Sequence, residues 1–122
     1  MASVLVVEDN AANMKLTRFL LESAGHTVLA ASDAEAGLTL ARDERPALIL
    51  MDIQLPGMDG LQATALLKQD AVTRDIPVIA LTALAMKGDE ERIRAAGCDG
   101  YVAKPIAYKE FLATIAARLP GP

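Results

Sequence analysis

The sequence predicts an α/β fold in which parallel strands form a sheet with helices on both faces. Short apolar runs alternate five times with stretches that have the apolar spacing of helices, and this alternation is typical of parallel sheets with right-handed crossovers. Three of the runs are almost continuously apolar, as expected for strands that are buried on both faces. The length of 122 residues suits one ordinary domain.

The strands are expected where the apolar runs lie. Val4–Val7, Leu48–Met51 and Val78–Leu81 lack the alternation of apolar and polar residues that marks a half-exposed strand. The five expected strands are Ser3–Val7, Thr27–Ala30, Ala47–Met51, Ile76–Leu81 and Gly100–Ala103.

Helices are expected between these strands. The first carries Leu16 and Leu20 at helical spacing and stops at Gly25, a residue type that commonly ends helices. The second carries Leu38 on its apolar stripe and has Asp33 as a candidate N-cap.

The later helices show similar signals. The fourth has acidic residues in its first turn, which suits the helix dipole, and is followed by Gly97. The fifth aligns Phe111, Ile115 and Leu119 on one face. The five expected helices are Ala11–Ala24, Asp33–Arg42, Leu61–Asp70, Asp89–Ala96 and Ala107–Leu119.

Five strand–helix units in a chain of this length favour the flavodoxin-like (βα)5 three-layer sandwich, with a parallel five-stranded sheet of order 2-1-3-4-5. No repeat, linker or low-complexity segment interrupts the chain, so residues 1–122 are expected to form a single domain. In this architecture, ligands bind outside the carboxyl ends of the strands, at the switch point between the first and third strands.

Composition excludes several classes of function. The net charge of −4, without a cluster of Lys and Arg, argues against a nucleic-acid partner. Cys98 is the one cysteine, so the chain cannot form an intramolecular disulfide, and a thiolate zinc site is disfavoured. No apolar run approaches the ~18 residues of a membrane span, so we expect a cytoplasmic protein without a membrane partner.

Polar residues that can do chemistry follow four of the five expected strands. Glu8 and Asp9 follow the first strand, Asp52 the third, Thr82 the fourth and Lys104 the fifth. Because the carboxyl ends of parallel strands meet at one edge of a sheet, these side chains are expected to converge there. Each residue alone is as easily a helix cap, a turn residue or a solvated lysine. Their joint placement indicates a site.

The three carboxylates predict a metal site. Close carboxylates repel one another, and Mg²⁺ relieves this repulsion because it binds a few carboxylates together with water and phosphate oxygens. A carboxylate can also attack phosphorus to form an aspartyl phosphate. The phosphoryl group in transfer needs positioning and charge neutralisation, which Lys104, the Thr82 hydroxyl and the Ala83 N–H can supply.

These residues lie within longer segments that resemble the motifs of a known family. The chain resembles a response-regulator receiver domain of the CheY-like superfamily over its whole length, and it is most similar to DivK-like single-domain response regulators. The segments that carry the receiver resemblance are Val6–Asn10, Leu50–Gly60, Leu81–Ala83 and Lys104–Pro105. Those that carry the DivK-like resemblance are Asn13–Leu16, Leu48–Pro56 and Ala85–Arg94.

The resemblance implies a role for each site residue. Asp52 is expected to be the phosphoacceptor, and Mg²⁺, for which Mn²⁺ can substitute, is expected to bind Glu8, Asp9, Asp52 and the backbone carbonyl of Gln54. Thr82 and Lys104 are expected to contact the phosphoryl group.

Two further expectations come from the same resemblance. Tyr101 is expected to act with Thr82 as an aromatic switch, although packing in the core is the alternative for this residue. The Lys104–Pro105 peptide bond is expected to be cis.

The implied function is a phosphorylation-dependent switch of a two-component phosphorelay, with cell-cycle or polarity control as a candidate role. The expected partners are a sensor histidine kinase or phosphatase, or a histidine phosphotransfer protein, and a downstream protein that binds the face of the fourth helix, fifth strand and fifth helix. The chain is expected to be a monomer and not an enzyme, apart from intrinsic Mg²⁺-dependent autophosphorylation and autodephosphorylation.

Three alternatives remain open at this point. The chain could be a receiver domain excised from a hybrid histidine kinase. It could be a phosphohydrolase with an aspartyl nucleophile of the haloacid-dehalogenase type, although that family usually has a second Asp where Gln54 stands. It could be a flavodoxin-type FMN module, although Glu8 and Asp9 would repel a phosphate at the helix N-terminus.

Overall fold

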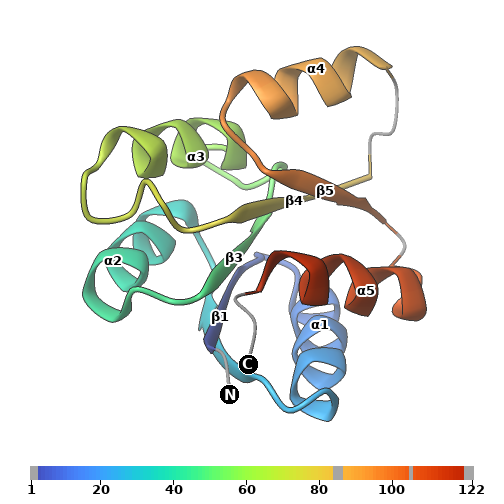
Figure 1. Ribbon diagram of the computed structural model, residues 1–122. Coiled ribbons are helices and arrows are strands. Elements are labelled where there is room, and N and C mark those ends of the chain that lie inside the picture. The colour runs from blue at the N-terminus through green and yellow to red at the C-terminus, as the bar shows by residue number, and fades with distance from the viewer. Residues whose placement is uncertain (1–2, 84–86, 105, 120–122) are drawn as a thin grey trace.

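The structure is a computed structural model, and it describes residues 3–83, 87–104 and 106–119. Five strands and five helices alternate along these residues (Figure 1). The strands are β1 (Ser3–Val7), β2 (Thr27–Ala31), β3 (Leu48–Asp52), β4 (Val78–Thr82) and β5 (Gly100–Ala103). The helices are α1 (Ala11–Ser23), α2 (Ala34–Glu44), α3 (Gly60–Gln69), α4 (Lys87–Ala95) and α5 (Tyr108–Arg118).

The strands form one parallel sheet in the order β2-β1-β3-β4-β5. The predicted fold class and strand order are therefore confirmed. Figure 1 shows α1 and α5 together on one side of the sheet and α2 and α3 together on the other. Among the described residues, no helix is both long enough and apolar enough to cross a membrane.

The core has two layers, one on each face of the sheet. Alternate residues of β1, β3 and β4 point into one layer or the other, so these three strands have almost no solvent contact, as their continuous apolar runs predict. One layer joins the sheet to α2, α3 and α4, and Ala41, Leu67 and Ile93 belong to it. The other joins the sheet to α1 and α5 through Leu21 and Phe111.

Two strand boundaries differ from the prediction in a way that affects the site. Asp52 and Thr82 are the last residues of β3 and β4, whereas the sequence placed them just after the strands. Asp52 pairs with Leu81, and Thr82 pairs with Ala103, so hydrogen bonding to the neighbouring strand extends each strand by one polar residue. Both side chains are therefore held by the rigid sheet and not by a loop.

The helix ends agree with the predicted signals to within a few residues. Asp33 is the N-cap of α2, as expected, because its side chain accepts a hydrogen bond from the N–H of Ala36. Gly25 and Gly97 have φ angles of +91° and +104°, which explains why helices stop at these glycines. The fourth helix begins at Lys87, two residues before the predicted start at Asp89.

A buried hydroxyl in α1 gives a prediction about stability. Thr17 is fully buried, and its hydroxyl has no hydrogen-bond partner in residues 3–83, 87–104 and 106–119. We expect Thr17→Val to raise the free energy of unfolding by about 1 kcal/mol, because valine removes an unsatisfied polar group without leaving a cavity. Urea denaturation measures this change.

A second buried threonine provides the matched control. The hydroxyl of Thr64 in α3 donates to the carbonyl oxygen of Gly60 at 2.8 Å, and Thr64 is also fully buried. Thr64→Val should therefore lower the free energy of unfolding by about 1 kcal/mol. Equal losses in the two variants would show that the Thr17 hydroxyl has a stabilising partner.

Candidate functional site

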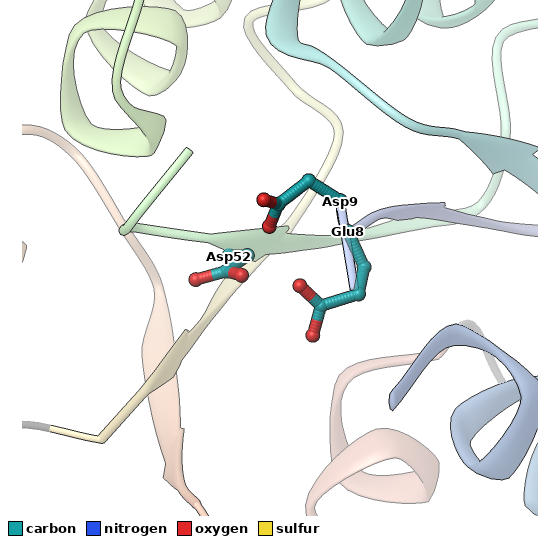
Figure 2. A group of neighbouring side chains, drawn as sticks. All are labelled: Glu8, Asp9 and Asp52. Carbon is teal, nitrogen blue, oxygen red and sulfur yellow. The ribbon is translucent and has the colours of Figure 1, made fainter. Parts of the chain in front are cut away.

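Three carboxylates from two neighbouring strands meet at the carboxyl edge of the sheet. Glu8 and Asp9 follow β1, and the N–H of Glu8 donates to the carbonyl oxygen of Ala31 at 3.0 Å, which continues the pairing with β2. Asp52 ends β3, which lies beside β1. Figure 2 shows the three side chains gathered around one space, and one carboxylate oxygen from each lies within 4.8 Å of the others.

The three acids differ in exposure. Glu8 and Asp52 are only 2% and 3% exposed, whereas Asp9 is exposed. Asn10 caps α1 by accepting a hydrogen bond from the N–H of Asn13 at 2.9 Å, which fixes the turn that carries the first two acids. The site therefore has a buried floor of two carboxylates and a third carboxylate at its opening.

One lysine neutralises the buried pair. The Nζ of Lys104, just after β5, donates to Glu8 Oε1 at 2.9 Å and to Asp52 Oδ2 at 3.1 Å. The backbone N–H of Lys104 donates to the carbonyl oxygen of Thr82 at 2.7 Å, which ties this lysine to the end of β4. The N–H of Gln54 donates to Asp52 Oδ1 at 2.9 Å. Both oxygens of Asp52 thus have donors.

Glu8 Oε2, the second oxygen of the neighbouring carboxylate, is buried and has no hydrogen-bond partner among the residues that the structure describes. A buried carboxylate oxygen without a partner is costly, so it points to a cation or a proton that belongs at this place. With the oxygens of Asp9 and Asp52 close by, the donor set fits a metal ion that prefers oxygen ligands.

The pKa values of the two buried acids shift in opposite directions. Burial, together with the neighbouring Asp52, raises the pKa of Glu8 to about 7. Burial also acts to raise the pKa of Asp52, but the neighbouring Glu8, the Gln54 N–H and the Lys104 ammonium outweigh it and hold this pKa below its usual range. The buried pair therefore holds a proton on Glu8 more readily than on Asp52.

Burial acts on the pKa of Lys104 in the opposite direction from its effect on the two acids. Burial acts to lower the pKa of Lys104, but its hydrogen bonds to Glu8 and Asp52 outweigh burial and raise this pKa. The lysine is therefore charged at neutral pH. At neutral pH the Asp52 carboxylate and the Lys104 ammonium are charged, and Glu8, with a pKa of about 7, is only partly ionised.

Two other predicted residues lie beside this centre. Thr82 is fully buried at the end of β4, one residue beyond Leu81, which pairs with Asp52. Ala83 follows it and is exposed. Thr82 and Ala83 therefore lie at the same edge of the sheet as the acids.

Tyr101 does not join this group. It lies within β5, it is 38% exposed, and its hydroxyl donates to Glu90 of α4. The predicted cis peptide bond between Lys104 and Pro105 involves a residue outside the described part of the chain.

Sequence reasoning missed two residues around the site. The sequence prediction starts the third helix at Leu61, but Gly60 is the first residue of α3 and lies against the backbone of Asp52. The spacing of Asp59 and Gln62, which form a capping box, was a signal for this helix start. The contact of Glu90 with Tyr101 had no signal, because it depends on how α4 packs beside β5.

The chain matches a known protein family along most of its length. The family model described as "Response regulator receiver domain" matches residues 4–116. The polar-differentiation response regulator DivK of Brucella anthropi is 54% identical over 117 residues, which are 96% of this chain and 95% of that protein. DivK of Brucella ovis is 53% identical over the same shares of the two chains.

Solved structures agree with this match. The chemotaxis protein CheY4 of Vibrio cholerae superposes with a TM-score of 0.92 at 26% identity, covering 98% of this chain and 99% of that chain. The receiver domain of a sensor histidine kinase from Pseudomonas aeruginosa superposes with a TM-score of 0.89 at 35% identity, covering 95% of each chain. That structure has a magnesium ion coordinated in its active-site cleft.

Proposed function

The chain belongs to the response regulator receiver family, as a DivK-like switch of two-component signalling, and we propose that its Asp52 accepts a phosphoryl group from a phosphohistidine. The observation that carries this proposal is the pair of buried carboxylates, Glu8 and Asp52, which share the single ammonium of Lys104 beside a third carboxylate. The proposed donor is a histidine kinase or a histidine phosphotransfer protein. The same family match argues against the phosphohydrolase and flavodoxin alternatives.

The proposed metal is Mg²⁺, which Mn²⁺ could replace. Glu8, Asp9, Asp52 and the backbone carbonyl of Gln54 would hold it. The support is the cluster of acids, in which one buried oxygen lacks a partner within the described part of the chain, together with the magnesium ion in the Pseudomonas receiver domain. When bound, the ion supplies positive charge that lets an anionic phosphoryl group approach these acids.

In the proposed transfer, a carboxylate oxygen of Asp52 attacks phosphorus. An O–P bond forms, the N–P bond of the phosphohistidine breaks, and the imidazole leaves with the electron pair of that bond. The depressed pKa of Asp52 keeps this nucleophile ionised at neutral pH. Lys104, the Thr82 hydroxyl and the Ala83 N–H then hold the phosphoryl oxygens, and Lys104 starts only 3.1 Å from Asp52.

The proposed output is a change of the surface that α4, β5 and α5 form. Thr82 would move toward the phosphoryl group and Tyr101 would turn inward, which shifts the population toward a form that a downstream protein binds. We further propose that residues 1–122 act as one monomeric receiver domain in the cytoplasm. The family is generally not one of classical enzymes, so only the formation and loss of the chain's own aspartyl phosphate are proposed.

A small phosphodonor tests the proposed function directly. Incubation of the protein with acetyl phosphate and Mg²⁺ should add the mass of one phosphoryl group, and the same incubation with a chelator should add none. Mass spectrometry at neutral pH measures both. An equal gain without divalent metal would contradict the assigned metal site.

The raised pKa of Glu8 predicts that the affinity for Mg²⁺ depends on pH. Because the pKa is about 7, Glu8 carries a proton at pH 6 and must release it before its oxygens can bind the ion. We therefore expect the affinity to rise about fivefold between pH 6 and pH 7, to reach about tenfold its pH 6 value at pH 8, and to level off above that. Isothermal titration calorimetry with MgCl₂ measures the dissociation constants.

The matched control is Glu8→Gln, which has no proton to release. It should bind Mg²⁺ more weakly than the wild type at pH 8, and its affinity should vary much less between pH 6 and pH 8. A wild-type affinity that is constant over this range would show that Glu8 is already ionised at pH 6.

A further inference from the structure

The hydroxyl of Tyr101 is hydrogen-bonded to a residue of helix α4. Tyr101 lies on β5, and its hydroxyl donates to the Glu90 carboxylate in the first turn of α4. A hydrogen bond to a charged acceptor is among the stronger kinds in proteins. This contact joins the edge strand of the sheet to the helix that packs beside it.

The sheet register places Tyr101 and Thr82 on the same face. Tyr101 pairs with Ala80, and Thr82 pairs with Ala103. Paired residues of neighbouring strands point to the same face, and so do residues two apart along one strand. Ala80 belongs to the core layer that contains Ile93 of α4. The Tyr101 ring thus starts on the side of the sheet where the buried Thr82 lies.

Packing leaves the Tyr101 ring loosely held. The residues beside it on this face, Ala80 and Ala103, have the smallest side chains that carry a Cβ. Tyr101 also lines a hollow of about 280 Å³, together with residues that include Glu90, Arg94 and Arg118. With more than a third of the side chain exposed, apolar contacts do little to fix its orientation. The hydrogen bond to Glu90 therefore has a large share in fixing it.

The geometry points to Glu90 as a positioning residue of the switch, which holds Tyr101 outward in the unphosphorylated protein. This inference rests on the proposed function, because it assumes that phosphorylation at Asp52 turns Tyr101 inward. The bond to Glu90 stabilises only the outward position, so phosphorylation has to outweigh it. Removing the carboxylate should let the inward position become populated without phosphorylation.

Because the chain has only two tyrosines, NMR can follow the position of the Tyr101 ring. The chain has two tyrosines, Tyr101 and Tyr108, so a protein labelled with ¹³C in its tyrosine rings gives two sets of NMR signals, and Tyr108→Phe assigns them. The signals are recorded without additions and with Mg²⁺ and beryllofluoride, a mimic of the phosphoryl group. Tyr108 on α5 is the internal reference.

We expect Glu90→Ala without the mimic to move the Tyr101 signal part of the way to its wild-type position with the mimic, which corresponds to a several-fold rise in the inward population. Glu91→Ala is the matched control, because it removes the same charge from the same helix at an exposed position. Its Tyr101 signal should coincide with the wild type.

A third variant separates positioning from a general effect of charge on α4. The amide oxygen of Glu90→Gln can still accept the hydrogen bond, so this variant should move the Tyr101 signal less than Glu90→Ala does. A titration of the tyrosine absorbance adds an independent readout. Glu90 raises the pKa of Tyr101, so the pKa should fall in Glu90→Ala.

The outcomes distinguish this inference from the proposed function. The mass gain with acetyl phosphate tests the function alone, and its absence removes both. With the mass gain present, three results overturn the inference. One is a Tyr101 signal in Glu90→Ala that coincides with the wild type, and another is a wild-type signal that does not move with the mimic. Equal movement in the Glu90→Ala and Glu91→Ala variants overturns it as well.

Discussion

Replacing Asp52 with Asn should give a folded protein that gains no phosphoryl mass from acetyl phosphate and Mg²⁺. A carboxamide has no charge and is a far weaker nucleophile than a carboxylate, so the loss should be complete within detection. The amide oxygen can still accept the hydrogen bond that Gln54 donates to Asp52, and the side chain keeps its size. Intact-protein mass spectrometry after a fixed incubation measures the loss, and circular dichroism shows that the fold remains.

Asp59→Asn is the matched control for this variant. Asp59 caps α3 by accepting a hydrogen bond from the N–H of Gln62 at 2.8 Å, and asparagine caps helices about as well. This change removes one carboxylate close to the site in sequence but outside the cluster of acids, and it should leave the mass gain in place. A phosphoryl mass that survives in Asp52→Asn would remove Asp52 from the role of acceptor.

The Asp52→Asn variant also tests whether Asp52 helps to raise the pKa of Glu8. Asp52 contributes, after burial, to the raised pKa of Glu8. Without that negative charge the pKa of Glu8 should fall toward its ordinary value of 4.5, which carboxyl-carbon NMR can follow. Since Lys104 would then neutralise Glu8 alone, the variant should remain about as stable as the wild type at pH 7.

Gly60→Ala should lower the free energy of unfolding by about 3 kcal/mol or more, which is a large share of the stability of a domain of this size. A Cβ at this position would lie 2.1 Å from the carbonyl oxygen of Asp52 and 2.7 Å from the Cα of Ile53. Both contacts are to backbone that the sheet holds in place. The clash can be relieved only if α3 moves away from the end of β3.

Other contacts oppose that movement. The N–H of Gly60 donates to the carbonyl oxygen of Ile53 at 3.3 Å, and the capping box of Asp59 and Gln62 fixes the first turn. Any shift of this turn also strains residues 53–59, which include the Gln54 N–H that binds Asp52. We therefore expect slower phosphorylation in addition to the loss of stability, which guanidinium denaturation measures.

Gly88→Ala is the control for the exchange of glycine for alanine. Gly88 lies in α4, and a Cβ there would meet no atom of the described residues within 4 Å. Alanine should stabilise this helix by about 0.5–1 kcal/mol, because it lowers the entropy of the unfolded chain without a clash. If Gly60→Ala is as stable as the wild type, α3 does not approach β3 as closely as the structure shows.

Much of the site could be predicted because its parts are tied to strand ends. Continuous apolar runs identify buried parallel strands, and parallel strands bring their carboxyl ends to one edge. Glu8, Asp9, Asp52, Thr82 and Lys104 could therefore be assigned to one place from their positions in the chain alone. The resemblance to receiver domains rested on these residues, and the family match agrees with it.

The sequence by itself determined the fold class, the order of the strands and the identity of the acids, because hydrophobic periodicity and the rules of parallel sheets depend on local spacing. The tertiary structure decided which of those acids are buried, that Lys104 lies between Glu8 and Asp52, that Gly60 leaves no room for a side chain and that Tyr101 binds Glu90. These facts depend on distances between elements far apart in the chain, and side-chain packing sets such distances, not the spacing along the sequence.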